Sequence, residues 1–142
     1  MSAAFSPPEG FELLVPTNPY WKQFGEVYAD RVRHRLAFRV GEHHCNPIQT
    51  LHGGALATFA DMQLLAMPEC TDAPGTHAPT ISLDIEYLAA AVCGDWVEAH
   101  VSLDRVTRRL IFSRAMISVG DTLIARANII YRNHDKTGYT LT

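Results

Sequence analysis

The chain has 142 residues, 47% of them hydrophobic, and a formal net charge of −3 at pH 7. This length suits one domain with its own core, and the apolar content excludes an intrinsically disordered chain. The charge, with no stripe of Lys and Arg, excludes a nucleic-acid surface. No apolar run approaches the length of a membrane span, so no membrane association is expected.

The cysteines and the start of the chain bear on its location. Three cysteines, an odd number without a CxxC pair, favour a reducing compartment. The chain opens with prolines and an acid where a signal peptide would place basic residues and an apolar core. We therefore expect a cytoplasmic protein.

The first 40 residues predict a helix followed by a strand. A short helix over residues 19–26 would carry its aromatic side chains on one side and cover an edge of the core; they are Tyr20, Trp21 and Phe24. Apolar residues with interleaved charges predict one strand over residues 29–40. We expect an N-terminal extension over residues 1–26 and a single domain over residues 27–142.

The central helix is predicted over residues 55–67, where good helix formers place apolar side chains at steps of three and four. Pro68 ends it. Asp61 then falls in mid-helix among apolar neighbours, where an unpaired carboxylate is costly. A place on a solvated stripe, or as a cap for a neighbouring loop, would account for it equally well. Residues 72–75 are expected to form a loop.

Four further strands are predicted by alternating or apolar runs, at residues 81–87, 96–103, 110–119 and 122–132. Gly120 and Asp121 form the expected hairpin turn between the last two. One helix among consecutive strands predicts an α+β domain with an antiparallel sheet. A single helix covers one face of such a sheet, so the other face must meet solvent or a partner.

The segment from Asn46 to Asp61 combines an amide, a Gly-Gly turn, a helix start and a carboxylate. Gly53 and Gly54 lack Cβ atoms, so another molecule can approach their N–H groups closely. The first N–H groups of a helix are unpaired and carry partial positive charge. Such donors stabilise an oxygen that gains negative charge. The segment therefore predicts a site that handles a carbonyl.

Residues 27–133 resemble the hotdog-fold thioesterases, specifically the phenylacetic-acid-degradation (PaaI-like) acyl-CoA thioesterases. The residues that carry the resemblance are Asn46, 51–54, Ala60, Asp61, 82–88, Gly94 and Asp95. The resemblance implies a hotdog fold, with five to six antiparallel strands around one long helix. It also implies an acyl-CoA substrate, no cofactor or metal, and a homodimer with its sites at the interface, often paired into a homotetramer.

The resemblance also implies catalytic roles. Asp61 would act as general base on water, which we favour, or as a nucleophile through an anhydride. The Gly53 N–H would bind the thioester oxygen, and the Asn46 amide would hold the carbonyl or the water. The acid would come from one subunit and the other two groups from its partner. Thr80 stands where relatives often carry a serine or threonine near the acid. Its hydroxyl would orient the water or Asp61, although Thr is also a common strand residue.

His52 and Gly54 are expected to bind substrate at most. A metal site built from His52 with His43, His44 and Cys45 is not expected, because adjacent residues in an extended segment point to opposite faces. Cys45 has no evident base partner, and buried cysteines commonly behave as small hydrophobes.

The chain departs from the family where residues 48–50 lack the glycine that relatives carry, and where residues 62–67 are bulkier. Both departures concern acyl preference more than chemistry. A hydratase or dehydratase of acyl thioesters would need a histidine soon after Asp61, and none precedes His77. A non-catalytic acyl-CoA-binding protein would have no need of the acid.

Overall fold

The structure, a computed structural model, describes residues 5–67 and 78–133. Its elements are β1 (Glu12–Leu13), α1 (Pro19–Phe24), β2 (Tyr28–Asp30), β3 (Arg35–Arg39), η1 (Glu42–His44), α2 (Gly53–Ala60), η2 (Gln63–Ala66), β4 (Thr80–Tyr87), β5 (Trp96–Val106), β6 (Leu110–Val119) and β7 (Thr122–Arg132). The two η elements are short 3₁₀ helices.

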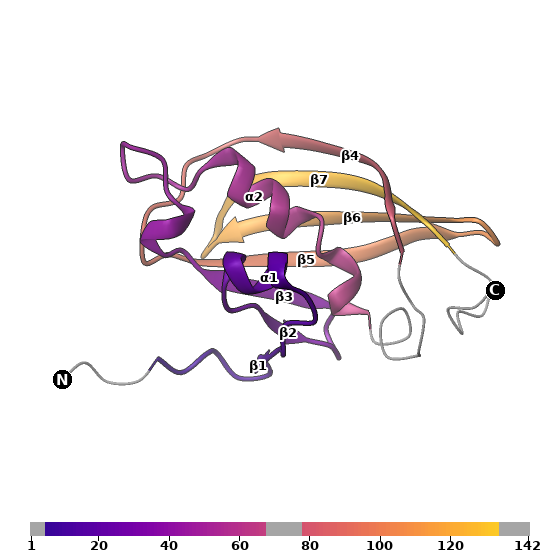
Figure 1. Cartoon of the computed structure of the whole chain (residues 1–142), viewed down its shortest axis with the longest axis horizontal. Coiled ribbons are helices and arrows are strands. Elements are labelled where there is room, and N and C mark those ends of the chain that lie inside the picture. Colours follow the sequence, from indigo (N-terminus) through magenta and orange to yellow (C-terminus); the bar gives the residue numbers. More distant parts are fainter. Residues whose placement is uncertain (1–4, 68–77, 134–142) are drawn as a thin grey trace.

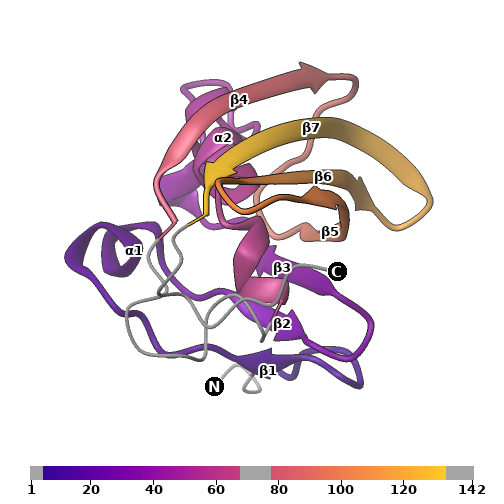
Figure 2. The same ribbon diagram turned by 90° about the vertical axis from the view of Figure 1, so that its right-hand side faces the viewer.

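All the strands form one antiparallel sheet of seven, in the order β1-β2-β3-β5-β6-β7-β4. The sheet curves, and α2 lies against its concave side (Figures 1 and 2). This is the predicted α+β arrangement of a sheet around one helix. The sheet has more strands than the five to six expected, because β1 joins its edge and the first predicted strand is divided in two.

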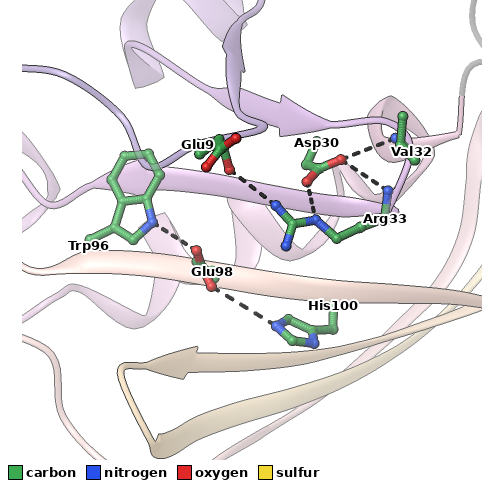
Figure 3. A network of polar contacts seen from close by, with 7 residues as sticks. All are labelled: Glu9, Asp30, Val32, Arg33, Trp96, Glu98 and His100. Carbon is green, nitrogen blue, oxygen red and sulfur yellow. Dashed lines mark hydrogen bonds and ion pairs between the residues drawn. The ribbon is translucent and has the colours of Figure 1, made fainter.

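The single strand predicted over residues 29–40 is wrong, because the chain turns back on itself between β2 and β3. Asp30 makes the turn: its Oδ1 accepts hydrogen bonds from the N–H groups of Val32 (3.2 Å) and Arg33 (3.0 Å). The Arg33 Nε donates to the other carboxylate oxygen at 2.6 Å, and its Nη2 donates to the Glu9 carbonyl at 3.1 Å (Figure 3). His34 completes the turn with a φ of 58°. Asp is common in turns, but here it is one of several charged residues between apolar ones, so the sequence pattern did not reveal the turn.

The central helix also differs from its prediction, since α2 begins at Gly53 and ends at Ala60. Asp61 is its C-cap residue. The Tyr131 hydroxyl donates to the Asp61 carbonyl at 2.6 Å, and the Leu65 N–H bonds the Met62 carbonyl instead. The backbone changes here to the tighter helix η2, and the Tyr131 hydroxyl from β7 bonds a carbonyl that the α-helical pattern no longer uses.

The core lies between α2 and the sheet. Phe59 and Leu56 of α2 are buried there, and the Phe59 ring centroid lies 4.6 Å from that of Phe38 on β3. Trp21 and Phe24 of α1 are buried in the same cluster, which confirms that the N-terminal helix covers an edge of the core, although Tyr20 is exposed and α1 ends at Phe24. Strands β6 and β7 begin and end at the predicted residues.

None of the helices in the described segments is long and apolar enough to cross a membrane. The loop predicted over residues 72–75 lies outside the described residues, as do Cys70 and His77.

Candidate active site

Asp61 and Thr80 lie in direct contact, as the family resemblance implied. The Thr80 Oγ1 donates a hydrogen bond of 2.6 Å to the Asp61 Oδ1. Asp61 is partly buried, and burial raises its pKa above the ordinary value. The hydroxyls of Thr80 and Tyr131 oppose that rise by hydrogen bonding, but burial dominates. A carboxyl with a raised pKa is a stronger base once ionised.

A cavity of about 880 Å³ adjoins this pair. Its walls come from five elements, and the residues they contribute include Tyr20 and Trp21 from α1, Ala57 and Thr58 from α2, Leu64 and Leu65 from η2, Thr80 and Leu83 from β4, and Tyr131 from β7. The volume falls in the range of small-molecule sites, and Asp61 is the carboxylate among its described lining residues. The cavity can therefore take an apolar group beside a carboxyl whose pKa is raised.

Gly53 lies at the other end of α2, at its first turn. Its N–H has no acceptor within residues 5–67 and 78–133, as expected of a helix start. Its carbonyl accepts a hydrogen bond from the Tyr87 hydroxyl at 2.8 Å. His52 is the N-cap residue, and its Nδ1 accepts from the Gly54 N–H at 2.8 Å. The predicted donor at Gly53 is thus exposed and available.

The Asn46 side chain organises the loop that precedes α2. Its Nδ2 donates to the Thr50 Oγ1 at 2.7 Å, and its Oδ1 accepts from the N–H groups of Ile48 and Thr50, each at 3.1 Å. Gln49 takes a φ of 66°, a conformation that glycine adopts more readily. This is the loop in which the family resemblance led us to expect a glycine. The expected contact of Asn46 with a carbonyl or water stays a prediction.

The two halves of the predicted site lie apart in one chain. Asp61 and Thr80 meet at the C-terminal end of α2, and Gly53 lies at its N-terminal end. The eight positions between Gly53 and Asp61 correspond to roughly 12 Å along a helix axis. One chain therefore contains both halves of the predicted site, the Asp61–Thr80 pair and the Gly53 N–H, but holds them apart.

The two histidines of η1 support the fold. The Nε2 atoms of His43 and His44 lie 2.8 Å and 2.6 Å from the Phe24 carbonyl oxygen. The His44 Nδ1 accepts from the Gly41 N–H at 2.9 Å, and burial lowers the pKa of His44. Among the described residues no three His, Cys, Asp or Glu side chains form a group that could hold a metal. Burial raises the pKa of Cys45, which disfavours the thiolate of a nucleophile.

Two tyrosines at the site were missed by the sequence analysis. Tyr131 bonds the Asp61 carbonyl and Tyr87 bonds the Gly53 carbonyl. Each occupies an ordinary position in an alternating strand, so the sequence carries no signal that separates these hydroxyls from those of structural tyrosines.

The comparisons with known proteins agree on one family. The model of the Thioesterase superfamily matches residues 48–125. Over 127 residues the chain is 32% identical to a provisionally named esterase of Pseudomonas aeruginosa, covering 87% of this chain and 95% of that protein.

Two solved structures show the same fold. A variant of the phenylacetic acid degradation protein PaaI from Thermus thermophilus is similar with a TM-score of 0.61 and 22% identity, covering 87% of this chain and 93% of that one. A hypothetical thioesterase from Streptococcus pneumoniae, solved with coenzyme A, is similar with a TM-score of 0.63 and 18% identity, covering 72% and 78%. The chain has the hotdog fold that its sequence predicted, and it belongs to the thioesterase superfamily.

Proposed function

We propose that the protein is an acyl-CoA thioesterase, which hydrolyses the thioester of an acyl- or aryl-CoA to a free acid and CoA. The hydrogen-bonded pair of Asp61 and Thr80 beside the apolar cavity carries this proposal. The cavity would take the acyl group. The pneumococcal neighbour with bound coenzyme A supports a CoA thioester as the substrate.

Asp61 would act as the general base in this reaction. Thr80 occupies its Oδ1, which leaves the Oδ2 to accept a proton from water. The water oxygen attacks the carbonyl carbon, and the electron pair of the C=O bond moves onto the carbonyl oxygen. The Gly53 N–H stabilises that oxyanion. When the intermediate collapses, the C–S bond breaks, and the CoA sulfur takes up the proton that Asp61 accepted.

A homodimer would bring the two halves of the site together. The base and the oxyanion donor must each lie about 3 Å from one carbonyl and its attacking water. Because Asp61 and Gly53 lie at opposite ends of α2, Asp61 of one chain and Gly53 of another meet this requirement more easily. Among the described strands β4 lies at the edge of the sheet, next to β7, and Ile81, Tyr87 and Leu88 are exposed large hydrophobic residues at this edge. An exposed apolar edge strand favours pairing with a second chain. The Asn46 of that chain would hold the carbonyl or the water, and pairing of dimers would give the expected tetramer.

The test is release of CoA thiol from a panel of aryl, short-, medium- and long-chain acyl-CoAs. Wild type should turn over at least one class, and Asp61→Asn should lose most of that turnover because the amide cannot accept the proton. Asp121→Asn, an exposed acid in the β6–β7 turn, serves as the matched control and should behave as wild type. Near-normal kcat in Asp61→Asn would remove this acid from the mechanism.

The same panel separates the alternatives. Tight CoA or acyl-CoA binding without thiol release from any substrate would favour the non-catalytic binding protein. Addition of water to an unsaturated acyl-CoA would favour a hydratase. The described lining of the cavity contains no histidine to serve that chemistry, so we expect thiol release instead.

A further inference from the structure

We propose that Tyr87 is a positioning residue, which fixes the direction of the Gly53 N–H through a hydrogen bond to the Gly53 carbonyl. This inference rests on the proposed function, in which that N–H polarises the thioester. Its basis is the way in which the peptide groups on both sides of Gly53 are held.

The peptide group between Gly53 and Gly54 is held at both of its polar ends. The Tyr87 hydroxyl donates to its C=O at 2.8 Å, and the His52 Nδ1 accepts from its N–H at 2.8 Å. A peptide group is planar, so these two side-chain contacts fix the orientation of the whole unit. Both contacts come from side chains and add to the helical hydrogen bond that the carbonyl of the first residue of α2 accepts.

The preceding peptide group carries the Gly53 N–H itself. Its carbonyl, that of His52, accepts from the Leu56 N–H at 3.0 Å. The Gly53 Cα therefore joins two peptide planes, one tied to the helix backbone and the other to Tyr87 and His52. Two consecutive glycines have wide backbone freedom, and the first turn of a helix has unpaired N–H groups. Without the hydrogen bond from Tyr87 the second plane would keep its helical bond and its contact with His52, and would lose the one contact that comes from β4.

The Tyr87 ring also closes the space beside Gly53. A Cβ placed on Gly53 would lie 3.5 Å from the ring carbon Cζ and 3.5 Å from the hydroxyl oxygen. The ring thus lies beside Gly53 at a distance that an added methyl group would fill.

One strand reaches both ends of α2. Thr80, the first residue of β4, bonds Asp61, and Tyr87, its last residue, bonds Gly53. In Figure 1 β4 runs alongside α2 in the opposite direction. The strand therefore sets the positions of the base and of the oxyanion donor through the two hydroxyls at its ends.

The test compares Tyr87→Phe with Tyr28→Phe. The first removes one hydroxyl and keeps the ring over Gly53. The second removes a hydroxyl that donates to Glu26 at 2.8 Å, away from the cavity lining. A small misplacement of a catalytic group can cost up to about a hundredfold in rate. We expect Tyr87→Phe to lower kcat about tenfold with KM and the melting temperature unchanged, and Tyr28→Phe to keep wild-type kcat.

A second readout follows the peptide directly. In ¹H–¹⁵N spectra of the intact protein, Tyr87→Phe should shift or broaden the Gly53 and Gly54 amide signals, and Tyr28→Phe should not. Wild-type kcat or unchanged glycine amides in Tyr87→Phe would overturn the positioning role. A loss of kcat that came only with a lower melting temperature or with dissociation would also overturn it. Asp61→Asn, run in parallel, separates the two claims: if it retains turnover the proposed function fails, and if it alone is inactive only the role of Tyr87 fails.

Discussion

Asp61 is held in a setting that favours its protonated form. Burial raises its pKa, and the hydroxyls of Thr80 and Tyr131 offset only part of that rise. The folded chain therefore binds this proton more tightly than the unfolded chain, whose carboxyl has a pKa of about 3.9. Ionisation of Asp61 lowers the free energy of unfolding as the pH rises past that value. The ionised form of the residue that would act as the base therefore lowers the stability of the folded chain.

Thr80→Val should move the acid limb of the pH profile. The Thr80 hydrogen bond favours the ionised form of Asp61, so its removal raises the pKa of Asp61 further. The base must be ionised to act, and kcat/KM should begin to fall at a higher pH than in wild type. Profiles from about pH 4 to about pH 8 test this. Thr80→Ser, which keeps the donor, should retain the wild-type limb; the same limb in Thr80→Val would mean that this hydrogen bond does not tune the base.

The sequence suggested candidate residues for the site, but it gave few of their contacts. Asp61 and Thr80 were expected near one another, and the hydrogen bond between them confirms this. The roles of Tyr87 and Tyr131 could not be predicted, because they depend on backbone carbonyls 34 and 70 positions away in the chain. Such contacts exist only once the sheet has formed.

At the scale of elements, α1 forms one wall of the cavity. The Tyr20 hydroxyl lies 3.0 Å from the Thr58 Oγ1 of α2, and Thr58 in turn donates to the Gly54 carbonyl at 3.1 Å. Tyr20 and Trp21 both line the cavity. The N-terminal helix is therefore hydrogen-bonded to α2 and limits the space beside Asp61.

Tyr20→Ala should widen acyl preference. The substitution removes the ring from the cavity wall and removes the hydrogen bond to Thr58. Larger acyl groups therefore gain room, and smaller ones lose contacts. Pocket contacts of this size change discrimination by roughly 10- to 200-fold, and Tyr20 is 65% exposed, so we expect the lower end. The ratio of kcat/KM for long over short acyl-CoAs should rise about tenfold. Val15→Ala, on the same segment but outside the described lining, is the control, and an equal ratio in the two variants would exclude α1 as a determinant of specificity.

The elements differ in how well local sequence predicts them. Strands β6 and β7 follow from apolar alternation and a Gly-Asp turn, both of which are local signals. The β2–β3 turn and the end of α2 depend on side chains, those of Asp30 and Tyr131, that capture backbone groups. Apolar alternation and helix propensity carry no information on such hydrogen bonds between a side chain and the backbone. The errors in both elements have this one physical origin.

At the scale of the whole molecule, α2 sets the distance between the two halves of the site. Asp61 and Gly53 occupy its opposite ends. A two-fold axis that places two copies of α2 side by side and antiparallel would bring the Asp61 end of each beside the Gly53 end of the other. Such an interface is isologous and closes as a dimer, with two equivalent sites. The exposed edge of β4 lies alongside α2 and is available for that contact (Figure 1).

Two inactive variants should therefore restore each other. Asp61→Asn lacks the base. Gly53→Pro lacks the oxyanion donor, and proline is well suited to this first helical position, where no N–H is needed by the helix. Each homodimer should have lost about a hundredfold or more in turnover. Co-expression gives heterodimers in which one site combines Asp61 of one chain with Gly53 of the other. Random pairing makes half of the dimers mixed, with one intact site of two, so about a quarter of the sites should be active.

Thiol release from the co-expressed mixture measures this recovery, with a mixture of separately refolded homodimers at the same concentration as the reference. Recovery places the base and the donor on different chains, whereas no recovery in mixed dimers of confirmed composition would place both in one chain and require α2 to bend toward a single carbonyl.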